Sequence, residues 1–325
     1  MTPGRRRLVL ALLALGLARP LRASTPVWPT RALRLIVVYP PGGLSDGVAR
    51  AIADGLAARL GVPVHVDNRA GGGGVVGLQA LARAAPDGHT LAFSATSPLT
   101  LRPRLGPVGF DPRRDIAPVA SAMLTPVLLV GTPAFTGERF ADLLQQARER
   151  PRALRWATSG VATAGHLVLE QVQAGAGIAV THVPYKGGGQ QLNDALSGQF
   201  ELLSTNVAPL QLQHVAAGRF KPLAVGAPRR LDVLPEVPTF AELGLPQANI
   251  GSLFGLFAPG GTPLALLDRL NAEINQVLAS PAIRDRLVAS DNLPAIDDRA
   301  AFARRITEAL RAGPEANPPA PGARR

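Results

Sequence analysis

The run from Leu33 to Leu60 constrains the fold more than any other part of the chain. It begins with a short apolar segment, Leu33–Val38, which is rich in β-branched residues and is followed by prolines, as a buried strand would be. Beyond the turn, apolar residues recur at helical spacing from Val48 to Leu60. A strand that leads through a tight turn into a helix is half of a β-α-β unit. This pattern predicts a parallel sheet with helices on both faces.

The same alternation continues, first over a short distance and then over most of the chain. A strand at Val62–Val66, a helix at Val75–Ala84 and a strand at Thr90–Phe93 complete a β-α-β-α-β unit. Strand-like and helix-like runs alternate again from 154 to 225, and helices are predicted between 263 and 312. We therefore predict the α/β class, with two units that each contain a mainly parallel sheet flanked by helices.

Two apolar segments are suited to joining these units. Val127–Val130 could carry the chain into the second unit, and Ser252–Ala258 could carry it back. Residues 98–120 are proline-rich and are predicted to be irregular. Two lobes with two crossing segments indicate a clamshell that closes around a ligand, and ligands bind outside the carboxyl ends of parallel strands. The predicted boundaries are 24–127 with 256–312 for lobe 1, 128–255 for lobe 2, and 313–325 for a disordered tail.

The N-terminus has the layout of a secretory signal peptide. Arg5-Arg6-Arg7 precede an apolar run from Leu8 to Ala18, Pro20 breaks that run, and a cleavage point follows Ala23. The apolar run is too short to span a membrane. Residues 1–23 therefore predict export, and the arginines permit either the Sec or the twin-arginine route.

Charge and composition exclude several classes of function. The net charge of +11 falls to +6 when the leader, with five arginines and no acid, is removed. The remaining basic residues are scattered, without aromatic residues between them, so nucleic-acid binding is not predicted. The chain has no cysteine, which excludes disulfides, thiolate metal sites and thiol catalysis. Metal-binding motifs are also absent from the sequence, so we expect no metal and no cofactor.

The turn between the first strand and its helix is a candidate ligand loop. Its sequence, Pro40-Pro41-Gly42-Gly43-Leu44-Ser45-Asp46, combines rigid prolines with glycines that allow a close approach of the backbone. Unpaired N–H groups and partial positive charge at the start of a helix suit an anion. The alternative is a plain strand-to-helix turn capped by Ser45 or Asp46.

Two motifs suggest catalysis, but each lacks a required partner. Gly72–Gly77 fits the dinucleotide pattern G-x-G-x-x-G, yet the acid expected about 20 residues later is replaced by Ser94–Ser97. A glycine loop that lines a cleft fits this segment better. Ser159 and His166 could form a hydrolytic pair only if the histidine faced the serine. A cap, a packing residue or a ligand contact is the preferred role for His166.

The second unit has its own hydroxyl-rich turn, Thr158–Thr163, at a predicted helix start. Small hydroxyl groups and free N–H groups there could grip a carboxylate, or could simply cap the helix. A further turn contains Tyr185 and Lys186. Tyr185 could wall the cleft, and Lys186 could pair with an anion or with Asp194; a structural contact is the alternative for both.

Taken together, these segments resemble the Bug-type receptors of tripartite tricarboxylate transporters, which are periplasmic solute-binding proteins. The resemblance extends from Trp28 to Arg305. The motifs that carry it are Tyr39–Asp46 with Ala49-Arg50, Asp67–Gly71, Ala85–Leu91, Ser159-Gly160 with His166-Leu167, His182–Gly187, Leu234–Thr239 and Gly255–Pro263.

The resemblance implies a type II periplasmic-binding-protein fold, no enzyme activity, and capture of a small organic anion, often a carboxylate, for a membrane transporter. In the family, the loops that match Pro41–Asp46 and Thr158–Thr163 hold the ligand. We expect a monomer. The predicted ligand-binding residues are Tyr39, Pro41, Gly42, Gly43, Ser45, Asp46, Thr96, Ser97, Thr158, Ser159, Gly160, Thr163, His166, Tyr185 and Asn206.

Within this set, Gly42, Gly43 and Ser45 are predicted to present N–H groups to the ligand. Asp46 is predicted to cap the helix and orient the loop rather than to touch the anion, because its negative charge would repel the anion. Two alternatives stay open at this point. The clamshell could signal to a membrane sensor kinase, or the protein could be an oxidoreductase or a hydrolase. The chain departs from the family pattern at Thr205, where Asp is frequent, at His89, where Tyr is common, and in its Pro/Ala-rich tail.

Overall fold

The computed structural model describes residues 28–289 and 291–311. The predicted signal peptide, 1–23, and the predicted tail, 313–325, lie outside these residues. The described residues from Arg31 to Arg311 belong to one compact unit. Among the described residues, no helix combines the length and the apolar character needed to cross a membrane.

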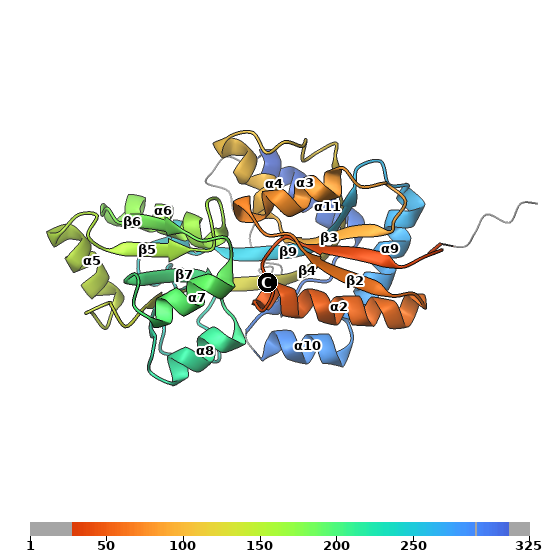
Figure 1. Cartoon of the computed structure of the whole chain (residues 1–325). Helices are drawn as coiled ribbons and strands as arrows, with labels where there is room; N and C mark the ends of the chain where they lie inside the picture. The colour runs from red at the N-terminus through yellow and green to blue at the C-terminus, as the bar shows by residue number, and fades with distance from the viewer. Residues whose placement is uncertain (1–27, 290, 312–325) are drawn as a thin grey trace, which may run out of the picture. The chain divides into compact units, whose positions relative to one another are not determined.

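The first lobe is built on three parallel strands that follow the predicted β-α-β-α-β order (Figure 1). β1 (Leu33–Val37) lies between β2 (Val64–Asn68) and β3 (Thr90–Ala95), and both pairings are parallel. α2 (Leu44–Leu60) connects β1 to β2, and α3 (Val75–Ala82) leads towards β3 after a short 3-10 turn, η1 (Gly72–Gly74). The carboxyl ends of β1 and β3 therefore lie at one edge, where the predicted ligand loop begins.

Two long strands connect this lobe to the second one. β4 (Ile116–Gly131) pairs antiparallel with β9 (Gly251–Pro259) along its first part, and β9 pairs antiparallel with β3. From Val127 onward, β4 pairs instead with β7 and β8 of the second lobe. The strand order is β2-β1-β3-β9-β4-β7-β5-β6, with β8 and β10 (Leu293–Pro294) also paired to β4. The sheet is therefore mixed, and its crossing strands are the two segments predicted to join the lobes.

The second lobe has parallel strands of its own. β5 (Arg155–Thr158) lies between β6 (Thr181–Pro184) and β7 (Leu202–Asn206), parallel to both. The helices after these strands begin at the edge where their carboxyl ends meet. The remaining elements of the lobe are α5 (Phe140–Glu149), α6 (Ala164–Ala176), α7 (Gly188–Leu196), α8 (Pro209–Ala216) and β8 (Lys221–Gly226).

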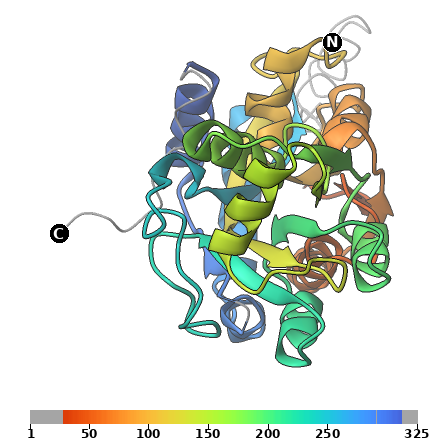
Figure 2. The same ribbon diagram turned by 90° about the vertical axis from the view of Figure 1, so that its left-hand side faces the viewer.

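Alternation along β4 explains how the second lobe forms a core on each face of its sheet. Val127 and Leu129 pack into one apolar cluster with α5 and α6, whereas Leu128 and Val130 pack into another with α7 and α8. Figure 2 shows these two helix pairs on opposite sides of the strands. In the first lobe, α9 (Leu264–Leu278) and α11 (Arg299–Arg311) pack against β4, and α10 (Pro281–Val288) lies beside α2 and α9.

Two element predictions were wrong, one at the site and one at the segment that joins the lobes. α2 begins at Leu44, so Ser45 and Asp46 lie inside its first turn rather than in the turn before the helix. Residues 98–120 are not all irregular: α4 (Ser97–Thr100) and η2 (Arg102–Leu105) lie there, and β4 begins at Ile116. The sequence hid this start because Pro118 reads as a loop residue. The strand tolerates it because the β4–β9 register shifts just after Pro118.

Candidate functional site

The predicted ligand loop of the first lobe is held in shape by the carboxylate of Asp46. Gly43 is the N-cap of α2, and Asp46 sits in the first turn with its side chain only 8% exposed. Its Oδ2 accepts the Gly42 N–H at 3.0 Å and Arg50 Nε at 3.0 Å, and its Oδ1 accepts Asn68 Nδ2 at 2.9 Å. Asn68 also donates to the carbonyl of Tyr39 at 3.1 Å. The Gly42 N–H is therefore occupied. The backbone N–H groups of Gly43 and Ser45 and the hydroxyl of Ser45 are the donors of this loop that are left for a ligand.

The charge of Asp46 is stabilised by the same bonds. Burial on its own raises the pKa of the carboxyl group, but the three donors around it outweigh burial and bring the pKa below its ordinary value of 3.8. Asp46 is therefore ionised at neutral pH and acts as the acceptor that orients the loop. Sequence reasoning missed Arg50 and Asn68 as its partners. The position of Asn68 at the end of the neighbouring parallel strand was the available signal.

Asp46→Ala should destabilise the protein, because it leaves three donors at a mostly buried position without their acceptor. We expect the free energy of unfolding to fall by about 2 kcal/mol. Urea unfolding would measure this change. Asp54→Ala is the matched control, since Asp54 is an exposed acid on the same helix. Equal losses in the two variants would contradict the assigned role of Asp46.

Tyr39 precedes the loop but turns its hydroxyl group away from it. The phenol is hydrogen-bonded to the backbone of Ala95 and to the side chain of Ser94, and burial raises its pKa to about 12. Its ring lies 6.0 Å from that of Phe254. Tyr39 therefore supports the floor of the loop from the core of the first lobe.

The hydroxyl-rich turn of the second lobe is also internally bonded. Thr158 is fully buried, and its Oγ1 lies 2.7 Å from His182 Nε2. Thr163, the N-cap of α6, donates its hydroxyl to the carbonyl of Gly160 at 2.8 Å. The hydroxyls of Thr158 and Thr163 thus shape the turn. Within the described residues, the hydroxyl of Ser159 has no partner, and Ser159 is half-buried.

His166 lies in the first turn of α6, where it is a hydrogen-bonded packing residue rather than a helix cap. Its Nδ1 accepts the backbone N–H of Ala162 at 3.3 Å, and its ring stacks on His182 with centroids 4.3 Å apart. The two imidazoles therefore stabilise the conformation of the Thr158–Thr163 turn, His166 through Ala162 and His182 through Thr158. Neither ring is hydrogen-bonded to Ser159, so the role of a packing residue fits His166 better than that of a cap or a catalytic base. His182 was not singled out from the sequence, because the residue that it contacts lies 24 positions away.

Both imidazoles resist protonation in the folded protein. Burial lowers the pKa of His166, although Glu170 at 3.7 Å opposes the shift. Burial, with a smaller contribution from His166, lowers the pKa of His182 from 6.5 to about 4. Since a protonated His166 Nδ1 could no longer accept the Ala162 N–H, protonation would break a bond that shapes the turn.

Stability should therefore decrease as the solution is acidified from pH 6.5 towards about pH 4. In this window the unfolded chain binds protons that the folded chain does not, so the free energy of unfolding rises with pH and falls on acidification. Thermal unfolding at a series of pH values measures the slope. His182→Gln, which keeps a hydrogen-bonding group near Thr158, should flatten it. An unchanged slope in that variant would show that other groups carry the effect.

Asp194 is bonded to Tyr185 and not to Lys186, which the sequence had suggested as its partner. The hydroxyl of Tyr185 donates to Asp194 at 2.7 Å, and its ring packs edge-on against Phe200. Burial, followed by that bond to Asp194, raises the pKa of Tyr185 to about 12. Asp194 is thus engaged by Tyr185, and the predicted pairing of Lys186 with Asp194 is wrong. Lys186 is exposed.

Glycines bring the two lobes into direct contact at two places. A Cβ placed on Gly73, in the glycine loop of the first lobe, would lie 2.8 Å from the carbonyl oxygen of Val161 in the second. One placed on Gly187 would lie 2.3 Å from Cδ of Pro40. Both distances are shorter than real Cβ contacts, so the approach requires residues without a side chain. The turns Pro40–Asp46 and Thr158–Thr163 therefore both lie beside the contact between the lobes.

The other predicted residues lie at the carboxyl ends of strands near the crossing segments. Thr96 and Ser97 follow β3, are half-buried, and have hydroxyls without a partner in the described part of the chain. Asn206 ends β7, and its Oδ1 accepts the Ser252 hydroxyl at 2.6 Å. Asn206 therefore ties the end of β7 to β9 and retains its amide N–H groups.

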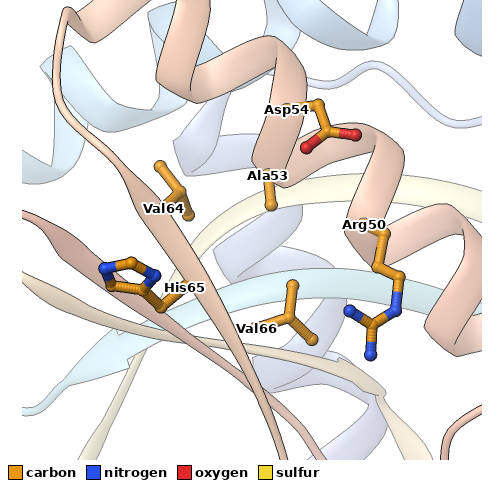
Figure 3. Close-up of a pocket in the computed structure, with 6 residues that line it drawn as sticks. All are labelled: Arg50, Ala53, Asp54, Val64, His65 and Val66. Atoms are coloured by element: carbon orange, nitrogen blue, oxygen red, sulfur yellow. The ribbon is translucent and has the colours of Figure 1, made fainter.

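A separate open groove lies on the other side of Arg50, the partner of Asp46. It has a volume of about 500 Å³, lies between α2 and β2, and is lined by Arg50, Ala53, Asp54, Val64, His65 and Val66 (Figure 3). None of the predicted site residues lines it. Residues 28–289 and 291–311 contain no group of three His, Asp or Glu side chains placed to hold a metal ion.

Comparison with known proteins shows the family to which the chain belongs. Residues 48–313 match the tripartite tricarboxylate transporter family receptor, TctC. The chain belongs to this family. One relative, protein BugT of Bordetella pertussis, is 36% identical over 283 residues, which cover 86% of each protein.

Solved structures agree with the type II periplasmic-binding-protein fold of the family. The R. palustris protein Rpa4515, solved with adipate, is 31% identical and superposes with a TM-score of 0.81, over 87% of this chain and 95% of that one. MatC of Rhodopseudomonas palustris, with bound malate, is 28% identical with a TM-score of 0.81, over 87% and 98% of the two chains. The TctC chain is thus a solute-binding receptor by family and fold, as the sequence predicted.

Proposed function

We propose that this member of the TctC family captures a small organic anion of the carboxylate class between its two lobes and delivers it to a tripartite tricarboxylate-type membrane transporter. The observation that carries the proposal is a pair of serine hydroxyls on opposite lobes that have no hydrogen-bond partner among the residues that the structure describes. Ser45 lies in the first turn of α2, and Ser159 lies on the turn before α6. Helix starts carry unpaired N–H groups and partial positive charge, so both sides of the closed clamp favour an anion.

The bonding pattern divides the predicted residues into two groups. Residues of the first group keep N–H or hydroxyl donors that are available to a ligand; they are Gly43, Ser45, Thr96, Ser97, Ser159 and Asn206. Residues that shape the site through bonds or packing within the protein are Tyr39, Pro41, Gly42, Asp46, Thr158, Gly160, Thr163, His166 and Tyr185. A clamp built largely from backbone and hydroxyl donors recognises a carboxylate group rather than one particular acid.

The proposed lobes keep the predicted boundaries, 24–127 with 256–312 for lobe 1 and 128–255 for lobe 2. Val127, where β4 exchanges β9 for β7 and β8, supports the first boundary. We further propose that residues 1–23 direct export to the periplasm, through the Sec or twin-arginine route, and are removed there. The carboxylates held by Rpa4515 and MatC support the ligand class.

A thermal-shift screen of the purified mature protein tests this function. The panel contains mono-, di- and tricarboxylates, aromatic acids, amino acids, and neutral and cationic solutes. A carboxylate at 100 times its dissociation constant should stabilise the folded state by about 2.7 kcal/mol. Stabilisation by neutral or cationic solutes alone would contradict the proposal. Turnover of an ester substrate that Ser159→Ala abolishes would instead favour the hydrolase alternative.

A further inference from the structure

Two glutamine side chains of the second lobe are buried and have no hydrogen-bond partner among residues 28–289 and 291–311. Gln191 is 1% exposed and Gln211 is 2% exposed. In both residues, the amide nitrogen and the amide oxygen lack a partner. Buried polar groups are nearly always paired, and leaving one unpaired costs free energy. Two such amides in one lobe therefore offer donors and acceptors that a bound molecule could pair with.

The topology places both amides at the edge of the sheet that faces the first lobe. Gln191 lies in the first turns of α7, which follows β6, and Gln211 lies in the first turn of α8, which follows β7. Since β5, β6 and β7 are parallel, these turns share the edge at which Thr158–Thr163 lies. Both helices pack on the same apolar cluster, and Figure 1 shows them side by side.

Contacts with the first lobe occur next to each glutamine. Gly187 and Gly189, at the start of α7, lie against Pro40 and Pro41 of the ligand loop. Just before α8, the carbonyl of Val207 accepts Asn292 Nδ2 at 3.4 Å, and its N–H donates to Pro126 at 3.0 Å. The segments that begin α7 and α8 thus lie beside contacts with the first lobe, and each carries one of the two buried glutamines.

We propose that Gln191 and Gln211 bind the end of the ligand remote from its carboxylate, and that this end is an uncharged group that both donates and accepts hydrogen bonds. This inference rests on the proposed carboxylate-binding function. Two primary amides offer four N–H donors and two carbonyl acceptors. A second carboxylate, which only accepts, would leave both carbonyl oxygens unpaired, whereas a carboxamide satisfies donors and acceptors alike. The neutral residues Thr205 and Asn206 at the end of β7 suit an uncharged group.

The test compares two isosteric variants with two matched controls. Gln191→Met and Gln211→Met keep the shape of the side chain and remove the amide. Gln190→Met and Gln213→Met make the same change at exposed positions on the same helices. Without ligand, the two buried variants should melt roughly 2 °C higher than the wild type, because an unpaired buried amide is replaced by an apolar group. A lower melting temperature for the buried variants alone would overturn the inference.

The probes are the monoamides of linear dicarboxylic acids from succinic to suberic acid, each paired with its parent dicarboxylate. The best monoamide should bind more tightly than its parent, and each buried variant should weaken it about tenfold. Monoamides that stabilise the protein no better than the dicarboxylates would overturn the inference and leave the proposed function standing. If no carboxylate of either kind stabilised the protein, the proposed function itself would fail, whatever the melting temperatures of the variants without ligand.

Discussion

Ser159→Asp should abolish carboxylate binding while leaving the protein folded. The substitution places a negative charge on the one hydroxyl of the Thr158–Ser159–Thr163 set that has no partner among the described residues. Two like charges about 4 Å apart near a protein surface repel by about 4 kcal/mol, so the affinity should fall by roughly 100-fold or more. The fold should tolerate the change, because an acid near the start of α6 interacts favourably with the helix dipole.

Ser159→Asn is the matched control, since it enlarges the side chain without adding charge. Calorimetric titration of both variants with the best carboxylate from the thermal-shift screen measures the difference. We expect Ser159→Asn to retain measurable binding and Ser159→Asp to retain none in the accessible range. Similar affinities for the two variants would show that no anionic group approaches Ser159.

Gly73→Ala should weaken ligand binding by preventing the lobes from closing fully. A Cβ on Gly73 would lie 2.8 Å from the carbonyl oxygen of Val161 across the lobe contact, and backbone there cannot move aside cheaply. Apparent affinity falls in proportion to the population of the closed state. We therefore expect a loss of about tenfold or more in affinity, measured by calorimetry.

Gly72→Ala separates closure from backbone strain. Gly72 and Gly73 have φ angles of 58° and 67°, so alanine is strained to a similar degree at both positions. A Cβ on Gly72 would only reach ordinary contact with Val75, 3.4 Å away in its own lobe. Gly72→Ala should therefore share any loss of melting temperature with Gly73→Ala but keep its affinity. Equal losses of affinity would indicate that strain in the loop, rather than the contact with Val161, controls binding.

Local patterns were sufficient to predict much of this structure. The turns Pro40–Asp46 and Thr158–Thr163 were predicted because each combines glycines or hydroxyl residues with a strand before it and a helix after it. Both turns do lie at carboxyl ends of strands. The crossing strands β4 and β9 were recognisable from their apolar runs, although the start of β4 was hidden by prolines in its sequence.

Contacts between distant residues could not be predicted in the same way. The hydroxyl of Thr158 turns towards His182, 24 positions away, so it is not available to a ligand as expected. The direction of a hydroxyl group depends on the neighbour that tertiary packing provides. Gln191 and Gln211 carry no sequence signal, because only burial distinguishes them from the exposed glutamines beside them.

A crystal structure of the protein with the best carboxylate from the screen tests the central claim most directly. The account predicts a ligand enclosed between the lobes, with a carboxylate oxygen about 3 Å from the Ser45 N–H or hydroxyl and from the Ser159 hydroxyl. Contacts with one lobe only, or a ligand in the groove between α2 and β2, would contradict it.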